Sequence, residues 1–344
     1  MIRACDWIAN YLYSQGVTTV HGLMGGGSSG INDGFIKHEN INYICYHHEQ
    51  GAGHGAIGEA KFTGNLAVVN PTTGCGGTNC ITSVLNAWQD AVPVLFLSGN
   101  VRLDTCSEWI NKKNNINIRK YGVQENHIIE NVKSICKKVI FVTSVNDIPR
   151  AISQAVHLCK EGRPGPVWVD IPSDLQTSSL TGPLVTFTGK IEEEYYPINF
   201  KNIKTLLNDA KRPVVLAGNG IRQSNTIKEF NYFITNYELP YVSTYGARDY
   251  SLHNHHLNIG AVGLRGSRAG NFAMQNSDLL LVLGSSLGAS VVGYDPSQFS
   301  PNSKKIMVDI EYDEMIKDII KIDRKISCSL KYFFDQMDIV RRIP

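Results

Sequence analysis

The residues best suited to chemistry lie in the run NYICYHHEQGAGHGAIGEAKFTG, residues 42–64. An apolar strand is predicted to end near His47, and the small residues after Gln50 predict a helix that packs closely on its neighbours. Glu49 therefore lies at a strand-to-helix junction, which is where parallel sheets bind ligands. A carboxyl group there can exchange a proton with a ligand. It can also cap the helix, which contributes under about 1 kcal/mol and is the better explanation for a glutamate considered alone.

Two other predicted strands end in glycine-rich turns. The turn TTGCGGTN contains Thr73, Gly74 and Asn79, and its backbone N–H groups can face a ligand without side chains in between. It has neither the Gly-Lys-Ser/Thr of a P-loop nor the G-x-G-x-x-G of a dinucleotide site. Gly25 and Gly26 lie in the turn GLMGGG, after the first strand. Any one such turn is ordinary, but three of them at three strand ends indicate that the backbone approaches something flat or bulky.

The remaining nucleophiles and metal ligands are weaker candidates. None of the eight cysteines belongs to a C-x-x-C pair, and several lie in apolar or helical runs, as Cys45 does, so we expect buried, reduced thiols. Cys75 lies in a glycine-rich turn, but no basic residue stands beside it to activate a thiolate. The ten histidines show no H-E-x-x-H or similar spacing. The sequence therefore predicts no nucleophilic cysteine and no metal site built from this chain alone.

Length and composition limit the class of protein. The 344 residues predict about two domains, each large enough for a core of its own. The 33 Lys and Arg against 31 Asp and Glu leave a net charge of +2, so no overall field attracts nucleic acid or anionic lipid. No apolar stretch is long enough for a membrane span, and the start MIRACDWIAN lacks a cleavable apolar core. We expect a cytoplasmic protein that acts on a small molecule, without a nucleic-acid or membrane partner.

The candidate turns need strands to position them. In the first half, apolar runs alternate with helix-length segments: VTTVHGL, NYICYHH, NLAVVNPTT, VPVLFLSGN, KKVIFVT and GPVWVDIP. This alternation is typical of a parallel sheet covered by helices. The pattern stops around 177–200 and restarts with RPVVLAGNG, LPYVSTYG, DLLLVLGSS and KKIMVDIE. The sequence therefore predicts an α/β protein with two doubly wound, mainly parallel-sheet, Rossmann-like domains, residues 1–182 and 198–344, joined by a linker over residues 183–197.

In this combination and order, the segments resemble those of thiamine-diphosphate-dependent enzymes of the acetolactate synthase type. The pyrimidine-binding domain of that family is similar to GVTTVHGLMGGG, HHEQGAGHGAIGEAKFTG, NPTTGCGGTNCITSVLNAWQDAVPVLFLSGN and GRPGPVWVDIPSDLQ. Its central Rossmann-like domain, which binds FAD or ADP in some members, is similar to RPVVLAGNGIR, GLRGSRAGNFAMQNSDLLLVLGSSLG and KKIMVDIEYDEM. The resemblance covers nearly the whole chain.

The resemblance implies the chemistry of Glu49, which matches the family's catalytic glutamate. In the family this carboxyl group hydrogen-bonds a ring nitrogen of the cofactor's aminopyrimidine and so promotes removal of the thiamine C2 proton, after which the thiazolium is an electron sink. His48, beside it, either orients the glutamate or is structural. The residues that the resemblance assigns to the thiamine diphosphate site are Gly25, Gly26, Glu49, Thr73, Gly74, Asn79 and Asn100.

The sequence also departs from the family pattern. Met24 replaces the family's usual Pro and Asn100 its usual Gln, which implies altered substrate preference or relaxed constraint. Members carry a third domain that holds the diphosphate through Mg²⁺ with a Gly-Asp-Gly signature, and this sequence contains no Gly-Asp-Gly. We therefore expect the diphosphate-binding domain to be a separate chain or to be lost by truncation, and magnesium to bind only through it.

The function implied is that of the pyrimidine-binding and central portion of an enzyme acting on 2-oxo acids. Its chemistry would be acetolactate synthase-like carboligation, decarboxylation or lyase chemistry, and we expect no activity from this chain alone. The resemblance also implies a homodimer or higher oligomer, with apolar helices such as CITSVLNAW near the interface.

Two alternatives from other classes remain open. A non-catalytic binding or scaffold protein that kept the fold is favoured by the missing third domain and disfavoured by the presence of Glu49. An FAD- or ADP-binding module would use the second domain, with Gly266, Ser267, Arg268 and the strand-end Asp309 holding the nucleotide.

Overall fold

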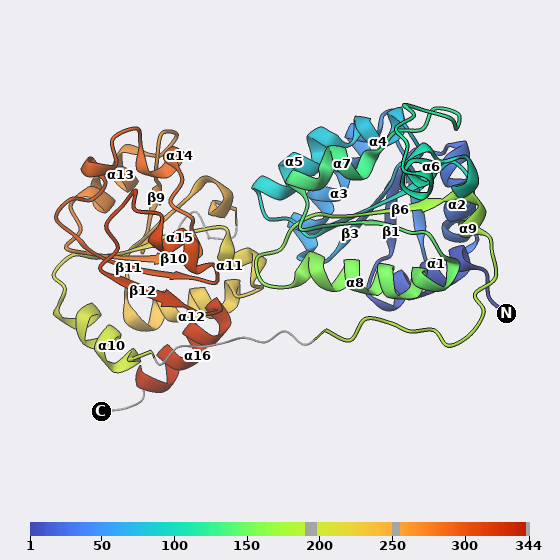
Figure 1. Cartoon of the computed structure of the whole chain (residues 1–344). Coiled ribbons are helices and arrows are strands. Elements are labelled where there is room, and N and C mark those ends of the chain that lie inside the picture. Colours follow the sequence, from blue (N-terminus) through green and yellow to red (C-terminus); the bar gives the residue numbers. More distant parts are fainter. Residues whose placement is uncertain (190–197, 250–254, 342–344) are drawn as a thin grey trace. The chain divides into compact units, whose positions relative to one another are not determined.

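A parallel sheet lies at the centre of each of the two units into which the chain divides, Met1–Ile191 and Glu192–Pro344. Figure 1 shows the computed structural model, which describes residues 1–189, 198–249 and 255–341. The predicted linker, residues 183–197, falls partly on residues 190–197, which lie outside the described residues, so the domain boundaries stay a prediction.

The first unit has a six-stranded sheet in the order β2-β1-β3-β4-β6-β5, with every neighbouring pair parallel. β3, β4 and β6 are buried along their whole length, as expected of strands covered by helices on both faces. The strands are β1 (Thr19–Gly22), β2 (Asn42–Cys45), β3 (Ala67–Asn70), β4 (Val94–Asn100), β5 (Lys138–Phe141) and β6 (Val167–Pro172).

The helices of this unit form a layer on each face of the sheet (Figure 1). One core contains side chains of α1 (Ala4–Ser14), α2 (Ser29–Lys37) and α8 (Ile148–Lys160). The other contains side chains of α3 (Glu49–Thr63), α5 (Ile81–Gln89) and α7 (Ile128–Val132). The shorter helices are η1 (Gly26–Ser28), α4 (Cys75–Asn79), η2 (Leu103–Thr105), α6 (Ser107–Asn114), η3 (Lys133–Ile135), η4 (Val145–Asp147) and α9 (Ser173–Gln176).

The second unit has a six-stranded parallel sheet in the order β12-β11-β10-β7-β8-β9, the arrangement of doubly wound nucleotide-binding folds. Its strands are β7 (Pro213–Ala217), β8 (Tyr241–Ser243), β9 (Asn258–Ala261), β10 (Leu279–Leu283), β11 (Lys304–Asp309) and β12 (Arg324–Ser327). Its helices are α10 (Phe200–Asp209), α11 (Gly220–Gln223), α12 (Ile227–Tyr237), η5 (Tyr245–Ala247), α13 (Arg268–Gln275), α14 (Ala289–Val292), η6 (Pro296–Gln298), α15 (Tyr312–Ile316) and α16 (Leu330–Arg341).

The predicted fold class is confirmed, because both units are α/β and their sheets are parallel throughout. In the described parts of the chain, no helix has the length and apolar character needed to cross a bilayer. The prediction of buried thiols is wrong for Cys45, which is exposed because β2 is an edge strand with a largely exposed outer surface. Cys75 is exposed as well, and the other cysteines are buried.

Candidate functional site

Glu49 is the first residue of α3 and follows the short connection from β2. The helix cap comes from its neighbour, because His48 Nδ1 accepts a hydrogen bond from the backbone N–H of Gln50 at 3.1 Å. The Glu49 residue is only 6% exposed. Capping is therefore performed by His48, and the buried carboxylate is left for another role.

The two carboxylate oxygens of Glu49 have different surroundings. Oε2 accepts a hydrogen bond from Asn79 Nδ2 at 2.9 Å, whereas Oε1 has no hydrogen-bond partner among the described residues. A Cβ on Gly76 would lie 3.2 Å from Oε1, so the glycine leaves space beside that oxygen. Within the described residues Oε1 is not among the fully buried polar atoms that lack a partner, so this oxygen remains accessible to a ligand. This arrangement fits a flat ring of which one nitrogen hydrogen-bonds to Oε1.

The two glycine-rich turns meet beside this carboxylate. Gly25 packs directly against Thr72, whose buried Oγ1 has no hydrogen-bond partner within the described residues. Gly26 faces open space. Gly74 has φ +61°, a conformation that other residues rarely adopt, and the backbone carbonyl of Gln124 passes against it. The predicted turns therefore line one site, and the loop that contains Gln124 covers part of it.

Thr73 and Asn100 are joined although they come from different strand ends. Thr73 Oγ1 donates to Asn100 Oδ1 at 3.2 Å, and Asn100 is the last residue of β4. The amide of Asn100 donates through Nδ2 to Asp170 Oδ2 of β6 at 2.6 Å. The structure thus brings the predicted site residues 25, 49, 73, 74, 79 and 100 to the same edge of the sheet and adds Asp170 behind them.

Asp170 is a buried carboxyl group, with only 1% of the residue exposed. Burial raises its pKa from the usual 3.8 to about 7, because the charged form loses its hydration. Hydrogen bonds from Ser98 and Asn100 oppose this rise, and the nearby charge of Glu108 adds to it. Both protonation states of Asp170 are therefore populated near neutral pH.

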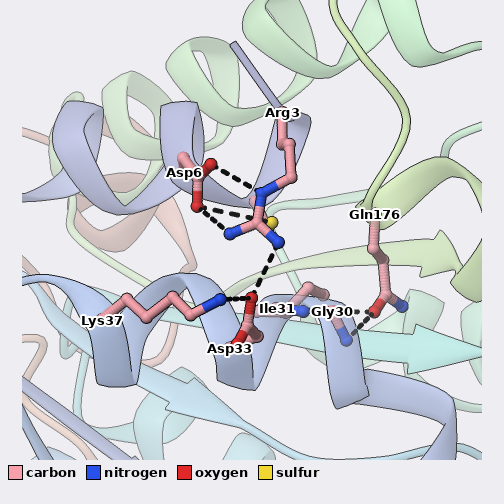
Figure 2. A network of polar contacts seen from close by, with 8 residues as sticks. Arg3, Asp6, Gly30, Ile31, Asp33, Lys37 and Gln176 are labelled. Carbon is pink, nitrogen blue, oxygen red and sulfur yellow. Dashed lines mark hydrogen bonds and ion pairs between the residues drawn. The ribbon is translucent and has the colours of Figure 1, made fainter.

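Gln176 anchors the first glycine-rich turn from α9. Figure 2 shows its Oε1 accepting from the backbone N–H groups of Gly30 and Ile31, at 3.1 and 3.2 Å. Its Nε2 donates to the carbonyls of Gly27 and Ile171, at 2.7 and 2.8 Å. Ser28, the residue that precedes α2, makes no side-chain cap bond. Gln176 supplies the missing cap and fixes the turn that precedes the helix.

Charged side chains hold the far end of α2 more weakly. Arg3 lies between Asp6 and Asp33, at 2.6 and 2.8 Å, and Lys37 approaches Asp33 at 2.9 Å (Figure 2). These side chains are partly exposed, so water screens the pairs and they contribute little to stability. The position of the turn therefore depends on Gln176 more than on these ion pairs.

Replacing Gln176 by Leu is expected to lower the free energy of unfolding of the first unit by about 4 kcal/mol, because three buried backbone groups and one partly buried group lose their partners. Amide hydrogen exchange at Gly30 and Ile31 should accelerate with it. Urea unfolding followed by tryptophan fluorescence measures the loss, since tryptophans 7, 88, 109 and 168 all lie in this unit. The exposed Gln15→Leu is the control, and equal losses in the two variants would contradict the role of Gln176.

Sequence reasoning missed Asp170 and Gln176. Both lie in VDIPSDLQ, the segment that ends β6 and forms α9. A charged residue inside an otherwise apolar strand was the available signal for Asp170. Gln176 gave no signal, because only the tertiary structure places its amide against residues almost 150 positions away.

The predicted nucleotide-binding residues of the second unit are not brought together. Ser267 caps α13 and Arg268 begins that helix, both after β9. Asp309 ends β11, where its Oδ1 accepts from the backbone of Glu311. The strand order places four strand spacings, about 19 Å, between β9 and β11. Gly266 lies with Ser267 on the β9 side.

Comparison with known proteins agrees with this geometry. A family model described as "Thiamine pyrophosphate enzyme, N-terminal TPP binding domain" matches residues 2–127, and one described as "Thiamine pyrophosphate enzyme, central domain" matches residues 200–337. The chain belongs to the thiamine pyrophosphate enzyme family. The predicted resemblance is therefore confirmed at the level of the family.

Several acetolactate synthases are relatives of this thiamine pyrophosphate family member. The large subunit from Lactococcus lactis subsp. lactis is 33% identical over 324 residues, which cover 93% of this chain and 54% of the relative. The isozyme 1 large subunit from Escherichia coli is 31% identical over 316 residues, covering 91% and 53%. The chain thus spans about half the length of the curated relatives it matches.

A solved structure from Mycobacterium smegmatis, described as that of a thiamin diphosphate-dependent enzyme, superimposes with a TM-score of 0.81. It is 19% identical and the match covers 98% of this chain and 62% of that one. At this identity the similarity shows the fold alone. The α/β arrangement of the two units is therefore one found in a solved structure of this class.

Proposed function

We propose that this chain is the pyrimidine-binding and central portion of a thiamine-diphosphate-dependent enzyme that acts on 2-oxo acids with acetolactate synthase-like chemistry. The observation that carries the proposal is the buried Glu49 carboxylate, which Asn79 holds through one oxygen while the other lies free beside Gly76. The cofactor, when bound, supplies the electron sink that carboligation, decarboxylation or lyase chemistry needs.

In this proposal Glu49 holds or moves a proton at a ring nitrogen of the aminopyrimidine. Glu49 is mostly buried, so a hydrogen bond from its carboxylate to the ring is stronger than it would be at the surface. In this proposal Asn79 fixes the direction of the carboxylate through its bond to Oε2. Gly25 and Gly26 approach the reacting centre in this proposal, and Thr73, bonded to Asn100, lines the pyrimidine site.

Magnesium and the diphosphate belong, in this proposal, to a further domain supplied in trans or by a longer polypeptide. Within the described residues, no group of three or more His, Cys, Asp or Glu side chains is arranged to hold a metal ion. The resemblance assigns that task to the Gly-Asp-Gly domain. We therefore assign to this chain only the pyrimidine half of the cofactor site.

We also propose a homodimer or higher oligomer that forms through the first unit. Phe62 on α3 is 89% exposed and Trp88 on α5 is 42% exposed, with Leu85 on α5 exposed as well. Large apolar side chains on two adjacent helices are typical of a surface that another subunit covers. This is the segment, CITSVLNAW, predicted to lie near an interface.

A second candidate function is FAD or ADP binding by the second unit. The observation that favours it is the strand order, whose switch point lies between β7 and β10. There the turns after these strands meet, with the Gly220 N–H donating to the Gly284 carbonyl at 2.9 Å. The glycines of AGNG and LGSS, rather than Gly266 and Asp309, line that position.

Thiamine titration of the isotope-labelled full chain tests the proposed function. We expect the backbone resonances of Gly76 and Asn79 to shift. Gly76→Ala should weaken binding at least about tenfold, because its Cβ would displace Thr72 Cγ2, which it would approach to 2.6 Å, and would fill the space beside Glu49 Oε1. Gly58→Ala on α3 is the matched control, since nothing lies within 4 Å of its Cβ. Wild-type protein without thiamine-dependent shifts at this site would contradict the proposal and favour a non-catalytic scaffold. The same titration with ADP tests nucleotide binding by the second unit.

A further inference from the structure

A directed series of hydrogen bonds starts in the core of the first unit. Trp168 Nε1 donates to Ser98 Oγ at 2.8 Å, and Ser98 Oγ donates to Asp170 Oδ1 at 2.5 Å. An indole nitrogen can only donate, so Ser98 accepts from Trp168 and has its single proton for Asp170. All three side chains are buried. The direction of these bonds is therefore set by the chemistry of the groups.

Asn100 continues the series to the pocket. Because its Nδ2 donates to Asp170, its Oδ1 faces the other way, where it accepts from Val101 N at 2.8 Å and from Thr73 Oγ1 at 3.2 Å. The hydroxyl of Thr73 has one proton and gives it to Asn100. Thr73 therefore offers only lone pairs to a ligand, and its turn is tied through Asn100 to Asp170.

We propose that Asp170 is a positioning residue that, through Asn100, holds the Thr73 turn in the shape that receives the pyrimidine ring of thiamine. This inference rests on the proposed function, since it assumes that the pocket beside Glu49 binds that ring. Asp170 contacts Asn100 rather than the pocket itself, so it acts on the pocket only through Asn100.

The protonation state of Asp170 controls the strength of this connection. When ionised, Asp170 accepts from both Ser98 and Asn100. A proton on Oδ2 would face the Asn100 amide, and a proton on Oδ1 would face the Ser98 hydroxyl. Protonation therefore weakens at least one bond, since charge-assisted hydrogen bonds are roughly twice as strong as neutral ones. Burial raises the pKa of Asp170 to about 7, so neutral pH samples both states.

Few charged groups surround Asp170. β4 presents uncharged side chains to it, Phe141 of β5 is its register partner, and α7 packs on this face through apolar side chains. Glu108 of α6 is the nearby charge that raises its pKa. The thiol of Cys106 interacts with Asp170, but burial raises the pKa of that thiol to about 11, so it stays neutral. Glu108 is therefore the group to separate from Asp170 by experiment.

The test is thiamine titration of the full chain by NMR at pH 6, 7 and 8. In wild type we expect the dissociation constant to rise about fivefold from pH 8 to pH 6, and Glu108→Gln should behave alike. Asp170→Asn should change less than about twofold, because its amide keeps an acceptor for Asn100 but cannot titrate. Thr73→Val should lose the pH dependence too, since it removes the hydroxyl that bonds Asn100. The NMR signal of the Asn100 side-chain amide should shift with pH, with a midpoint near pH 7, in wild type and not in Asp170→Asn.

Each result decides the proposal. Asp170→Asn removes only the titratable carboxyl at position 170, so its comparison with wild type isolates Asp170. Equal pH profiles for wild type and Asp170→Asn overturn the positioning role, and so does a flat profile in Glu108→Gln alone. An unchanged profile in Thr73→Val overturns it independently, on a variant that leaves the core intact. If wild type binds no thiamine at any pH, the proposed function fails, and this inference fails with it.

Discussion

Replacing Glu49 by Gln is expected to lower turnover at least about 100-fold in any assembly in which this chain converts a 2-oxo acid with thiamine diphosphate. Glutamine has the shape of glutamate, so the Asn79 bond to its oxygen survives. Its amide can hydrogen-bond a ring nitrogen but cannot transfer a proton to or from it. Cofactor affinity should therefore change much less than turnover. Exchange of the thiamine C2 hydrogen for deuterium, followed by NMR, measures the lost step directly.

Glu59→Gln is the matched control for this prediction. Glu59 lies on the same helix and pairs with His21 at 2.6 Å, and the bond that Asn79 donates goes to Glu49 instead. It should retain turnover and C2 exchange within about threefold of wild type. Full turnover in Glu49→Gln, or an equal loss in both variants, would remove Glu49 from its assigned role.

The fold was predictable because each buried strand is an uninterrupted apolar run. β3, β4 and β6 are buried along their length, and the hydrophobic effect selects such runs for the inside of a parallel sheet. The candidate site was predictable to the extent that its residues end these strands, as Asn100 does. Glu49 gained its assignment from the resemblance, since a lone glutamate at a helix start is explained better by a cap.

The remaining parts of the site depend on which strands are neighbours, and a single sequence does not contain that order. Asp170 lies behind Asn100 because β6 pairs with β4, although 70 residues separate them. Strand order also explains why Ser267 and Asp309 are far apart, on opposite sides of the β7–β10 switch point. Cys45 is exposed for the same reason, since β2 has a neighbour on only one side.

Asp170→Asn is expected to abolish a large pH dependence of stability. The native carboxyl has its pKa raised to about 7, against 3.8 for the ordinary group. The native state therefore binds a proton more tightly than the unfolded state between about pH 4 and pH 7. The free energy of unfolding must fall as the pH rises through this window, by up to about 4 kcal/mol, and level off above it. An asparagine at this position does not titrate, so the variant lacks that fall.

Urea unfolding followed by tryptophan fluorescence at pH 5, 6, 7 and 8 measures the difference, because all four tryptophans report on the first unit. The stability of wild type relative to Asp170→Asn should decrease steadily up to about pH 7 and then stay constant. Asp90→Asn, which neutralises a carboxylate on the surface of the same unit, should run parallel to wild type. Parallel curves for Asp170→Asn would mean that this carboxyl titrates normally. A steep difference would instead show that the chain retains a buried charge that destabilises it above about pH 7, as expected when a group is kept for position rather than for stability.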